Sequence, residues 1–158
     1  MVLLLARTHY SLLTAPASPT QLCEAAVQQG HDHLALVDGN GLYGLWPFAR
    51  QAARLGLQPI FGCELVHRGR RLFALATDRR GYASLCELLS ARQLEADFDL
   101  PRTAAAMAEG LVFLCRDLRL LPELAVRLPR DQLFAAVGPR GEPALAESAV
   151  VSGGRKAP

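Results

Sequence analysis

Short aliphatic runs alternate along the chain with amphipathic stretches, and this alternation predicts strands alternating with helices. The predicted strands are bounded by glycine, proline or polar residues and lie at 2–6, 34–37, 58–61, 71–76, 111–114 and 133–137. The predicted helices lie at 19–29, from the glycine turn at 39–41 to about 55, and at 81–91, 103–108 and 118–127. Such alternation indicates parallel βαβ units, so we expect an α/β fold of about six mostly parallel strands, as an open sheet or part of a barrel.

Two segments refine this pattern. Residues 64–67 and 71–76 flank Arg68-Gly69-Arg70, which has the composition of a hairpin turn. From residue 138 onward, proline, glycine, serine and other small residues replace the apolar runs. We therefore predict one folded domain over residues 1–137 and a disordered tail over 138–158.

Composition narrows the class of protein. Of the 158 residues, 51% are hydrophobic and 20% charged, which is typical of a globular protein, and the net charge of +2 is too small to indicate nucleic-acid binding by itself. No stretch approaches the ~18 apolar residues that a membrane span needs, so we predict no membrane association. The cysteines form no CxxC pair and lie in or beside apolar runs, which favours free buried thiols and a cytoplasmic location. They are Cys23, Cys63, Cys86 and Cys115.

The residues that could carry chemistry follow three predicted strands. His9 follows the first strand, Asp38 ends the second, and Glu64 follows the third. Because the carboxyl ends of parallel strands meet at one edge of a sheet, we expect Asp38 and Glu64 side by side. An imidazole and two carboxylates can hold Zn²⁺ or Mn²⁺, which would generate hydroxide or clamp a phosphate oxygen. In the alternative interpretation, Asp38 caps the following helix, Glu64 is a solvated strand residue and His9 is merely exposed.

A second candidate ligand pair is His31 and His33, which have the common His-x-His spacing. Both precede the second predicted strand, whereas Asp38 ends it, so the two groups belong to opposite ends of the sheet. We therefore interpret both histidines as surface residues of a loop.

A cluster of basic residues surrounds the predicted hairpin. Arg68, Arg70 and Arg71 could contact the phosphates of a nucleic acid. No aromatic residues are interleaved with them, as single-strand binding would favour. A charged hairpin edge that discourages strand pairing is the alternative explanation.

A series of motifs in a fixed order fills the part of the chain from about Tyr10 to Ala91. The motifs are Tyr10–Leu13, Leu34–Asp38, Asn40–Gly44, Gly56–Glu64 and Leu72–Asp78. In this order and spacing they resemble the polymerase and histidinol phosphatase (PHP) domain, in the form that opens the α subunit of bacterial C-family DNA polymerase III. The likeness is dense over that part of the chain and faint beyond it, through Gly110–Leu114.

The resemblance implies a distorted (β/α) barrel, of which this chain would form a truncated part. Active members of the family hold two or three metal ions and hydrolyse phosphoesters, and in some polymerases the domain proofreads as a 3′–5′ exonuclease. Other members have lost the metals and serve as structural or partner-binding parts. The resemblance therefore leaves both an active and a silent domain open.

At the metal-binding positions this chain departs from the family pattern. Leu5-Ala6-Arg7 replaces the family's opening His-x-His, and Asp38-Gly39 replaces its Asp-His pair, whereas Glu64 keeps its glutamate. No histidine follows His67, so the family's later ligands are lacking as well. Because arginine is permanently charged, we expect an ion pair of Arg7 with Asp38 and Glu64 in place of a metal.

These observations favour a catalytically silent PHP-like domain without a cofactor, acting as a scaffold or partner-binding piece in DNA replication or repair synthesis. Its expected partners are other polymerase or replication and repair subunits, with DNA as a further partner, and a second copy of the chain could cover an exposed sheet edge. The first alternative is a metal-dependent phosphoesterase that uses His9, Asp38 and Glu64 to hold Zn²⁺ or Mn²⁺. The second is a nucleic-acid-binding module that uses Arg68, Arg70 and Arg71.

Overall fold

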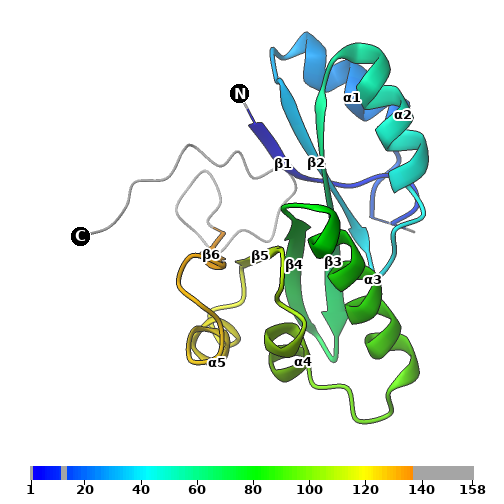
Figure 1. Ribbon diagram of the computed structural model, residues 1–158. Helices are drawn as coiled ribbons and strands as arrows, with labels where there is room; N and C mark the ends of the chain where they lie inside the picture. The colour runs from blue at the N-terminus through cyan, green and yellow to red at the C-terminus, as the bar shows by residue number, and fades with distance from the viewer. Residues whose placement is uncertain (1, 12–13, 137–158) are drawn as a thin grey trace.

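The computed structural model describes residues 2–11 and 14–136, so the predicted tail at 138–158 lies outside the described residues. Within them, six strands form one sheet in the order β1-β2-β3-β4-β5-β6 (Figure 1). The strands are β1 (Val2–Ala6), β2 (His33–Gly39), β3 (Gln58–His67), β4 (Arg70–Ala76), β5 (Leu111–Cys115) and β6 (Leu133–Ala135). The predicted α/β class is confirmed.

The strand directions place several chain segments at one edge of the sheet. β1 pairs with β2, β2 with β3, and β5 with β6 in parallel, whereas β4 is antiparallel to both of its neighbours. The expectation of a mostly parallel sheet is therefore confirmed. The carboxyl ends of the five co-directional strands share one edge with the beginning of β4, and this edge carries the candidate site.

The helices cover one face of the sheet. They are α1 (Pro19–Gln28), α2 (Leu45–Leu55), α3 (Arg79–Leu94), α4 (Leu100–Ala106) and α5 (Leu121–Ala125). Helices α1 and α2 pack on Leu34 and Leu36 of β2, whereas α3 to α5 pack on the outward-facing residues of β3, β4 and β5. No described helix is both long and apolar enough to cross a bilayer.

We call the other face of the sheet the inner face. It has an apolar cluster of its own. Alternate residues of the strands meet there, because successive side chains of a strand point to opposite faces. The cluster consists of Leu5, Ala35, Val37, Phe73, Leu75, Leu114 and Ala136. A sheet with helices outside and apolar side chains inside is the arrangement of part of a barrel.

Several element boundaries differ from the sequence prediction. The predicted strands 58–61 and 64–67 are one continuous strand, β3, because Gly62 lies at close packing in the sheet, where an added Cβ would lie 2.7 Å from the carbonyl oxygen of Ala74. Helix α4 begins at Leu100, three residues before the predicted start, because Asp99 caps it by accepting a hydrogen bond from Arg102 N–H. Helix α5 accommodates Pro122 in its first turn.

The β3–β4 hairpin has the turn that the sequence predicts, but with an unusual residue in it. Arg68 and Gly69 both have positive φ, 48° and 78°, as both central residues of a type I′ turn do. Asparagine adopts this conformation more readily than arginine, so we expect Arg68→Asn to raise the free energy of unfolding by about 0.5 kcal/mol. Urea unfolding measures the change, with Gly69→Ala as a destabilising control, and a stability loss in Arg68→Asn would contradict this account of the turn.

Candidate functional site

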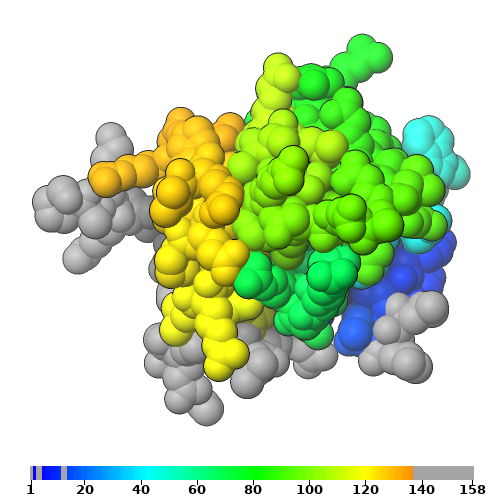
Figure 2. Space-filling model, turned by 90° about the horizontal axis from the view of Figure 1, so that it is seen from below, coloured from blue at the N-terminus to red at the C-terminus, as the bar shows by residue number. Residues whose placement is uncertain are grey.

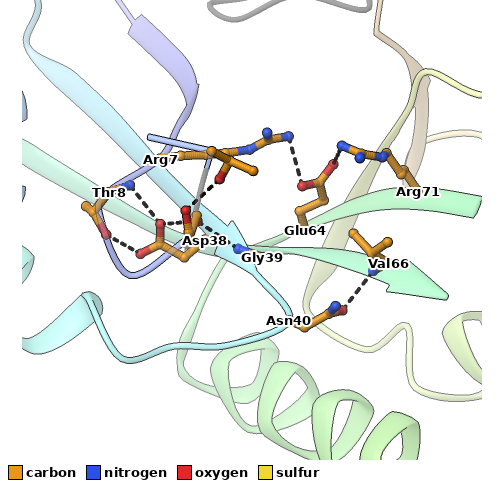
Figure 3. A network of polar contacts seen from close by, with 10 residues as sticks. Arg7, Thr8, Asp38, Gly39, Asn40, Glu64, Val66 and Arg71 are labelled. Carbon is orange, nitrogen blue, oxygen red and sulfur yellow. Dashed lines mark hydrogen bonds and ion pairs between the residues drawn. The ribbon is translucent and has the colours of Figure 1, made fainter. Parts of the chain in front are cut away.

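The register of β2 and β3 decides how the two candidate carboxylates are placed. Asp38 is opposite Cys63, and Gly39 is opposite Glu64. Since paired residues of neighbouring strands point to the same face, Asp38 lies on the face that the helices cover and Glu64 on the inner face. The expectation that Asp38 and Glu64 lie side by side is therefore wrong. Both belong to the same edge of the sheet, but the one-residue offset turns their side chains away from each other (Figure 3).

Asp38 is a buried anchor for the loop that follows β1. Its Oδ1 accepts hydrogen bonds from the Thr8 backbone N–H at 2.7 Å and from the Ser11 hydroxyl at 2.6 Å. Its Oδ2 accepts a bond of 2.6 Å from the Thr8 hydroxyl. The Asp38 side chain is enclosed, because a Cβ added at Gly44 would lie only 2.6 Å from Oδ2. Asp38 does not cap helix α2, whose N-cap, Gly44, has no side-chain hydrogen bond.

Glu64 is held by two arginines on the inner face. Its Oε2 lies 2.8 Å from Arg7 Nη2, and its Oε1 lies 3.3 Å from Arg71 Nη1, so each carboxylate oxygen has a guanidinium partner (Figure 3). The Arg7 guanidinium also lies 5.8 Å from the ring centre of Phe73, within cation–π range. Only 5% of the Glu64 side chain is exposed, so the alternative that Glu64 is a solvated strand residue is wrong.

The expected ion pair of Arg7 with Asp38 and Glu64 is thus found only in part. The structure brings Arg7 to Glu64 but not to Asp38, whose oxygens accept hydrogen bonds from Thr8 and Ser11 instead. Arg71, which the sequence placed in a possible nucleic-acid contact, is the second partner of Glu64. The physical reason is the alternation of β2, which places the Asp38 carboxylate on the opposite face of the sheet from Glu64.

The residues at this edge do not fit a divalent metal ion. His9 is exposed, and its ring lies against Tyr10 with 4.5 Å between ring centres. Both oxygens of Asp38 accept short hydrogen bonds, and both oxygens of Glu64 face guanidinium groups. Among residues 2–11 and 14–136, no three histidine, cysteine, aspartate or glutamate side chains gather as a metal site would require. The positive charge beside Glu64 would also repel a divalent cation.

Cys63 lies between these residues but does not supply a nucleophile or a thiolate ligand. It is fully buried in β3 on the side of the sheet that the helices cover. Burial is the main reason that the pKa of the Cys63 thiol is raised to about 12, and the nearby Cys86 and Glu64 contribute to the rise in the same direction. The thiol is therefore protonated and unreactive at neutral pH.

We expect this protection to be visible in alkylation of the native protein. At pH 8, iodoacetamide should modify Cys86, which is partly exposed, more than about tenfold faster than Cys63. Peptide mapping by mass spectrometry measures the two rates, and labelling in denaturant, where both thiols are accessible, serves as the control. Equal rates in the native protein would contradict the buried position of Cys63.

The two loop histidines differ in their environment. His31 is buried, with 7% of its surface exposed, so the expectation that it is a surface residue is wrong. It follows the left-handed Gly30, and its backbone N–H donates a hydrogen bond of 2.9 Å to the carbonyl oxygen of Ala26 in α1. His33 is the first residue of β2 and lies 2.8 Å from a carboxylate oxygen of Asp32. Both histidines are at the amino end of β2, whereas Asp38 is near its carboxyl end.

The hairpin arginines have separate environments. Arg70 makes a bidentate ion pair with Glu123 of α5, with N–O distances of 2.9 and 2.8 Å. Arg71, the next residue of β4, points to the inner face and Glu64. Arg68 lies in the hairpin turn. Two of the three arginines, Arg70 and Arg71, thus form ion pairs, and these ion pairs lie on opposite faces of the sheet.

Arg116 is a further residue at this edge of the sheet that the sequence analysis did not single out. It directly follows β5, as Arg7 directly follows β1, and one of its guanidinium nitrogens, Nη2, is buried without a hydrogen-bond partner among residues 2–11 and 14–136. Burial lowers the pKa of Arg116, and the charges of Arg7 and Arg71 lower it further, against the opposite effect of Glu64. The signal in the sequence was an arginine placed immediately after an apolar strand.

The comparisons with known proteins agree with this architecture. The family model of the PHP domain matches residues 4–128. The chain belongs to the PHP domain family. In this member of the family, Glu64 is paired with arginines and Asp38 accepts hydrogen bonds from hydroxyl groups.

Among curated proteins, this PHP domain is similar to error-prone DNA polymerases. It is 39% identical to the one from Corynebacterium diphtheriae over 96 residues, which are 60% of this chain and 9% of that protein. It is 41% identical to the one from Anaeromyxobacter dehalogenans in an alignment of 90 residues that covers 53% of this chain and 8% of that protein. The chain thus spans less than a tenth of the length of these relatives.

Solved structures show the same fold at low sequence identity. A protein from Bifidobacterium adolescentis assigned as a metal-dependent phosphoesterase superposes with a TM-score of 0.58 at 15% identity, covering 90% of this chain and 78% of that one. A two-domain protein from Bacteroides vulgatus, described as containing a predicted PHP-like metal-dependent phosphoesterase, gives a TM-score of 0.54 at 15% identity, covering 72% of this chain and 33% of that one. These likenesses concern the fold alone.

Proposed function

We propose that this chain is a catalytically silent PHP domain that serves as a scaffold or partner-binding piece beside a polymerase, in DNA replication or repair synthesis. The observation that carries the proposal is that the oxygens of both carboxylates, Asp38 and Glu64, already have hydrogen-bond or ion-pair partners within the protein. Glu64 has an arginine on each oxygen, and Asp38 accepts three hydrogen bonds on the opposite face of the sheet. A hydrolytic metal centre would need these oxygens free and facing one another.

The polymerase context rests on the relatives. Over more than half of this chain, the similarity is to proteins named error-prone DNA polymerase. Because the matched part is less than a tenth of those proteins, the polymerase activity itself is not assigned to this chain. We propose a cytoplasmic location on the same context.

A hydrolysis assay tests the silent state. The purified protein is incubated with Mn²⁺ or Zn²⁺ and either bis(p-nitrophenyl) phosphate or single-stranded DNA labelled at its 5′ end. We expect no release above the rate of the variant Glu64→Gln, since Arg7 and Arg71 engage both oxygens of Glu64 that an activating metal would need. Metal-dependent hydrolysis by the wild type that disappears in Glu64→Gln would favour the phosphoesterase alternative instead.

The partner-binding role is supported by the edge at β6. Among the described strands, β6 pairs on one side only, with β5. Large apolar side chains on this strand and around α5 are exposed, namely Leu118, Val126 and Phe134. Figure 2 shows α5 and β6, in yellow to orange, along one side of the visible surface. An unpaired edge with apolar neighbours favours a covering partner, either a polymerase or repair subunit or a second copy of this chain.

Light scattering tests the second-copy form of this role. We expect a particle mass of twice the 17.1 kDa of the chain, and a return to the monomer mass in Phe134→Glu, whose charge disfavours edge pairing. Tyr43→Glu changes an aromatic residue of another segment that is even more exposed than Phe134, and it serves as the control. A wild-type monomer would exclude self-association through this edge.

A further inference from the structure

Three arginines gather on the inner face at the carboxyl edge of the sheet; we call Arg7, Arg71 and Arg116 the arginine cluster. Arg7 and Arg71 meet at the two oxygens of Glu64. In the antiparallel pairing of β4 with β5, Leu72 is opposite Cys115, so Arg71 and Arg116 are the next residues along the same two strands. The charges of Arg7, Arg71 and Glu64 all act on the Arg116 guanidinium, which places it within the same group. Side chains from the start of β4 and from the residues that directly follow β1 and β5 are thus brought to one place.

The charges of this group are not balanced. Three guanidinium groups face one carboxylate, Glu64, whose two oxygens are already engaged by Arg7 and Arg71. Asp38 does not add its charge on this face, because its side chain points to the helix layer and binds Thr8 and Ser11. The cluster therefore retains a positive charge that the described residues around it do not neutralise.

One guanidinium nitrogen of Arg116 also lacks an acceptor within the part of the chain that the structure describes. Its Nη2 atom is buried and has no partner among the described residues, although a buried donor without an acceptor is costly and rare in folded proteins. An unpaired donor of this kind needs an explanation, and a bound anion beside the excess positive charge of the cluster would accept its hydrogens. The ligand must carry negative charge and several oxygens, since a guanidinium offers a planar fork of donors.

We propose that the arginine cluster binds a phosphate dianion, free or as the terminal group of a phosphomonoester, directly through guanidinium groups and without a metal ion. A dianion matches the excess charge of three arginines over one glutamate. Its oxygens can accept paired hydrogen bonds from guanidinium, the geometry in which arginine recognises phosphate. The inference rests on the metal-free state proposed above and is independent of the partner-binding role.

Phosphate binding is measured by calorimetry and by thermal unfolding in EDTA, with sodium chloride at matched ionic strength as the reference. The variant is Arg116→Gln, and the matched control is Arg54→Gln, which removes one exposed positive charge from the last turn of α2. We expect phosphate to raise the unfolding temperature of the wild type and of Arg54→Gln. In Arg116→Gln its affinity should fall at least about tenfold, the effect of losing a charge-assisted contact. Without phosphate, Arg116→Gln should be at least as stable as the wild type, because a buried unsatisfied donor is gone.

Inorganic phosphate and deoxyadenosine 5′-monophosphate distinguish the sources of the group. Tighter binding of the nucleotide would identify a nucleotide end as the ligand, and equal binding would identify the phosphate alone; either result supports the proposal. Phosphate that acts no better than chloride, or equally on the wild type and Arg116→Gln, would overturn it. Because EDTA is present throughout, this failure is separate from metal-dependent hydrolysis, which would overturn the silent domain instead.

Discussion

Replacing Glu64 with glutamine is expected to lower the free energy of unfolding by about 2–4 kcal/mol. Glu64 is the carboxylate that neutralises Arg7 and Arg71 at an edge where Arg116 adds a third positive charge. Glutamine keeps the size of the side chain but leaves three guanidinium groups to repel one another around a neutral amide. The loss stays below that of a fully buried pair because 56% of the Arg71 side chain is exposed to solvent.

Glu123→Gln is the matched control for this experiment. Glu123 also pairs with an arginine, Arg70, in good bidentate geometry, but both side chains are 40% exposed. We expect its loss to cost less than about 1 kcal/mol. Urea unfolding at low and high salt measures both variants, and added salt should recover part of the Glu64→Gln loss by screening the arginines. A Glu64→Gln effect as small as that of Glu123→Gln would contradict the anchoring role of Glu64.

Asp38→Asn is the second large change, with an expected loss of about 2–3 kcal/mol. Asp38 accepts three hydrogen bonds within a buried site, from Thr8 N–H, the Thr8 hydroxyl and the Ser11 hydroxyl. An asparagine side chain has one acceptor oxygen and presents an NH₂ group to a donor on its other side. The close approach of Gly44 leaves the new amide little room to turn away.

Asp99→Asn is the corresponding conservative control. Asp99 caps α4 by accepting the Arg102 N–H, and asparagine caps a helix about as well as aspartate, so its stability should change by less than about 0.5 kcal/mol. Hydrogen exchange gives a second readout for Asp38→Asn. Protection should be lost at the backbone N–H groups of Thr8 and Gly39, which are bound through Asp38 and through the Ser11 hydroxyl, respectively. Unchanged protection there would contradict the account of Asp38 as the anchor of this loop.

The sheet was predictable from the chain because its strands are apolar runs with clear boundaries. The hairpin was equally predictable, since Gly69 supplies a conformation that few other residues adopt. The continuity of β3 was not predictable, because a glycine within an apolar run indicates the end of a strand. Only the structure shows that Gly62 packs closely against Leu75 and Ala74 within the sheet. The early start of α4 was not predictable either. Its cap, Asp99, lies in a polar segment whose composition is typical of a loop.

The candidate site was predictable only in part. That Asp38 and Glu64 belong to the same edge follows from their positions after two apolar runs. Their opposite faces depend on a register in which Gly39, not Asp38, is opposite Glu64, and no sequence pattern fixes that register to one residue. Arg116 was missed because its neighbours come from strands more than forty positions away in the chain. Likewise, the hydroxyl groups that bind Asp38 belong to a loop whose conformation the sequence does not specify.

The same register suggests how metal binding could be restored. Leu5, Arg7, Gly39 and Glu64 lie toward the inner face, as shown by the packing of Leu5 on the inner cluster, the contact of Arg7 with Phe73 and the pairing of Gly39 with Glu64. The family resemblance places histidines at the first three of these positions. Gly39 has open space where a Cβ would be added, so a side chain fits there. The triple variant Leu5→His/Arg7→His/Gly39→His therefore serves as a positive control for metal binding.

Calorimetric titration of the wild-type protein with Mn²⁺ tests the central claim most directly, beside this triple variant and Glu64→Gln. The account predicts no binding to the wild type that depends on Glu64, because arginines engage both oxygens of that carboxylate. It predicts binding to the triple variant, in which three imidazoles share the inner face with a Glu64 freed from Arg7. Stoichiometric binding of Mn²⁺ to the wild type that is lost in Glu64→Gln would contradict the silent PHP domain.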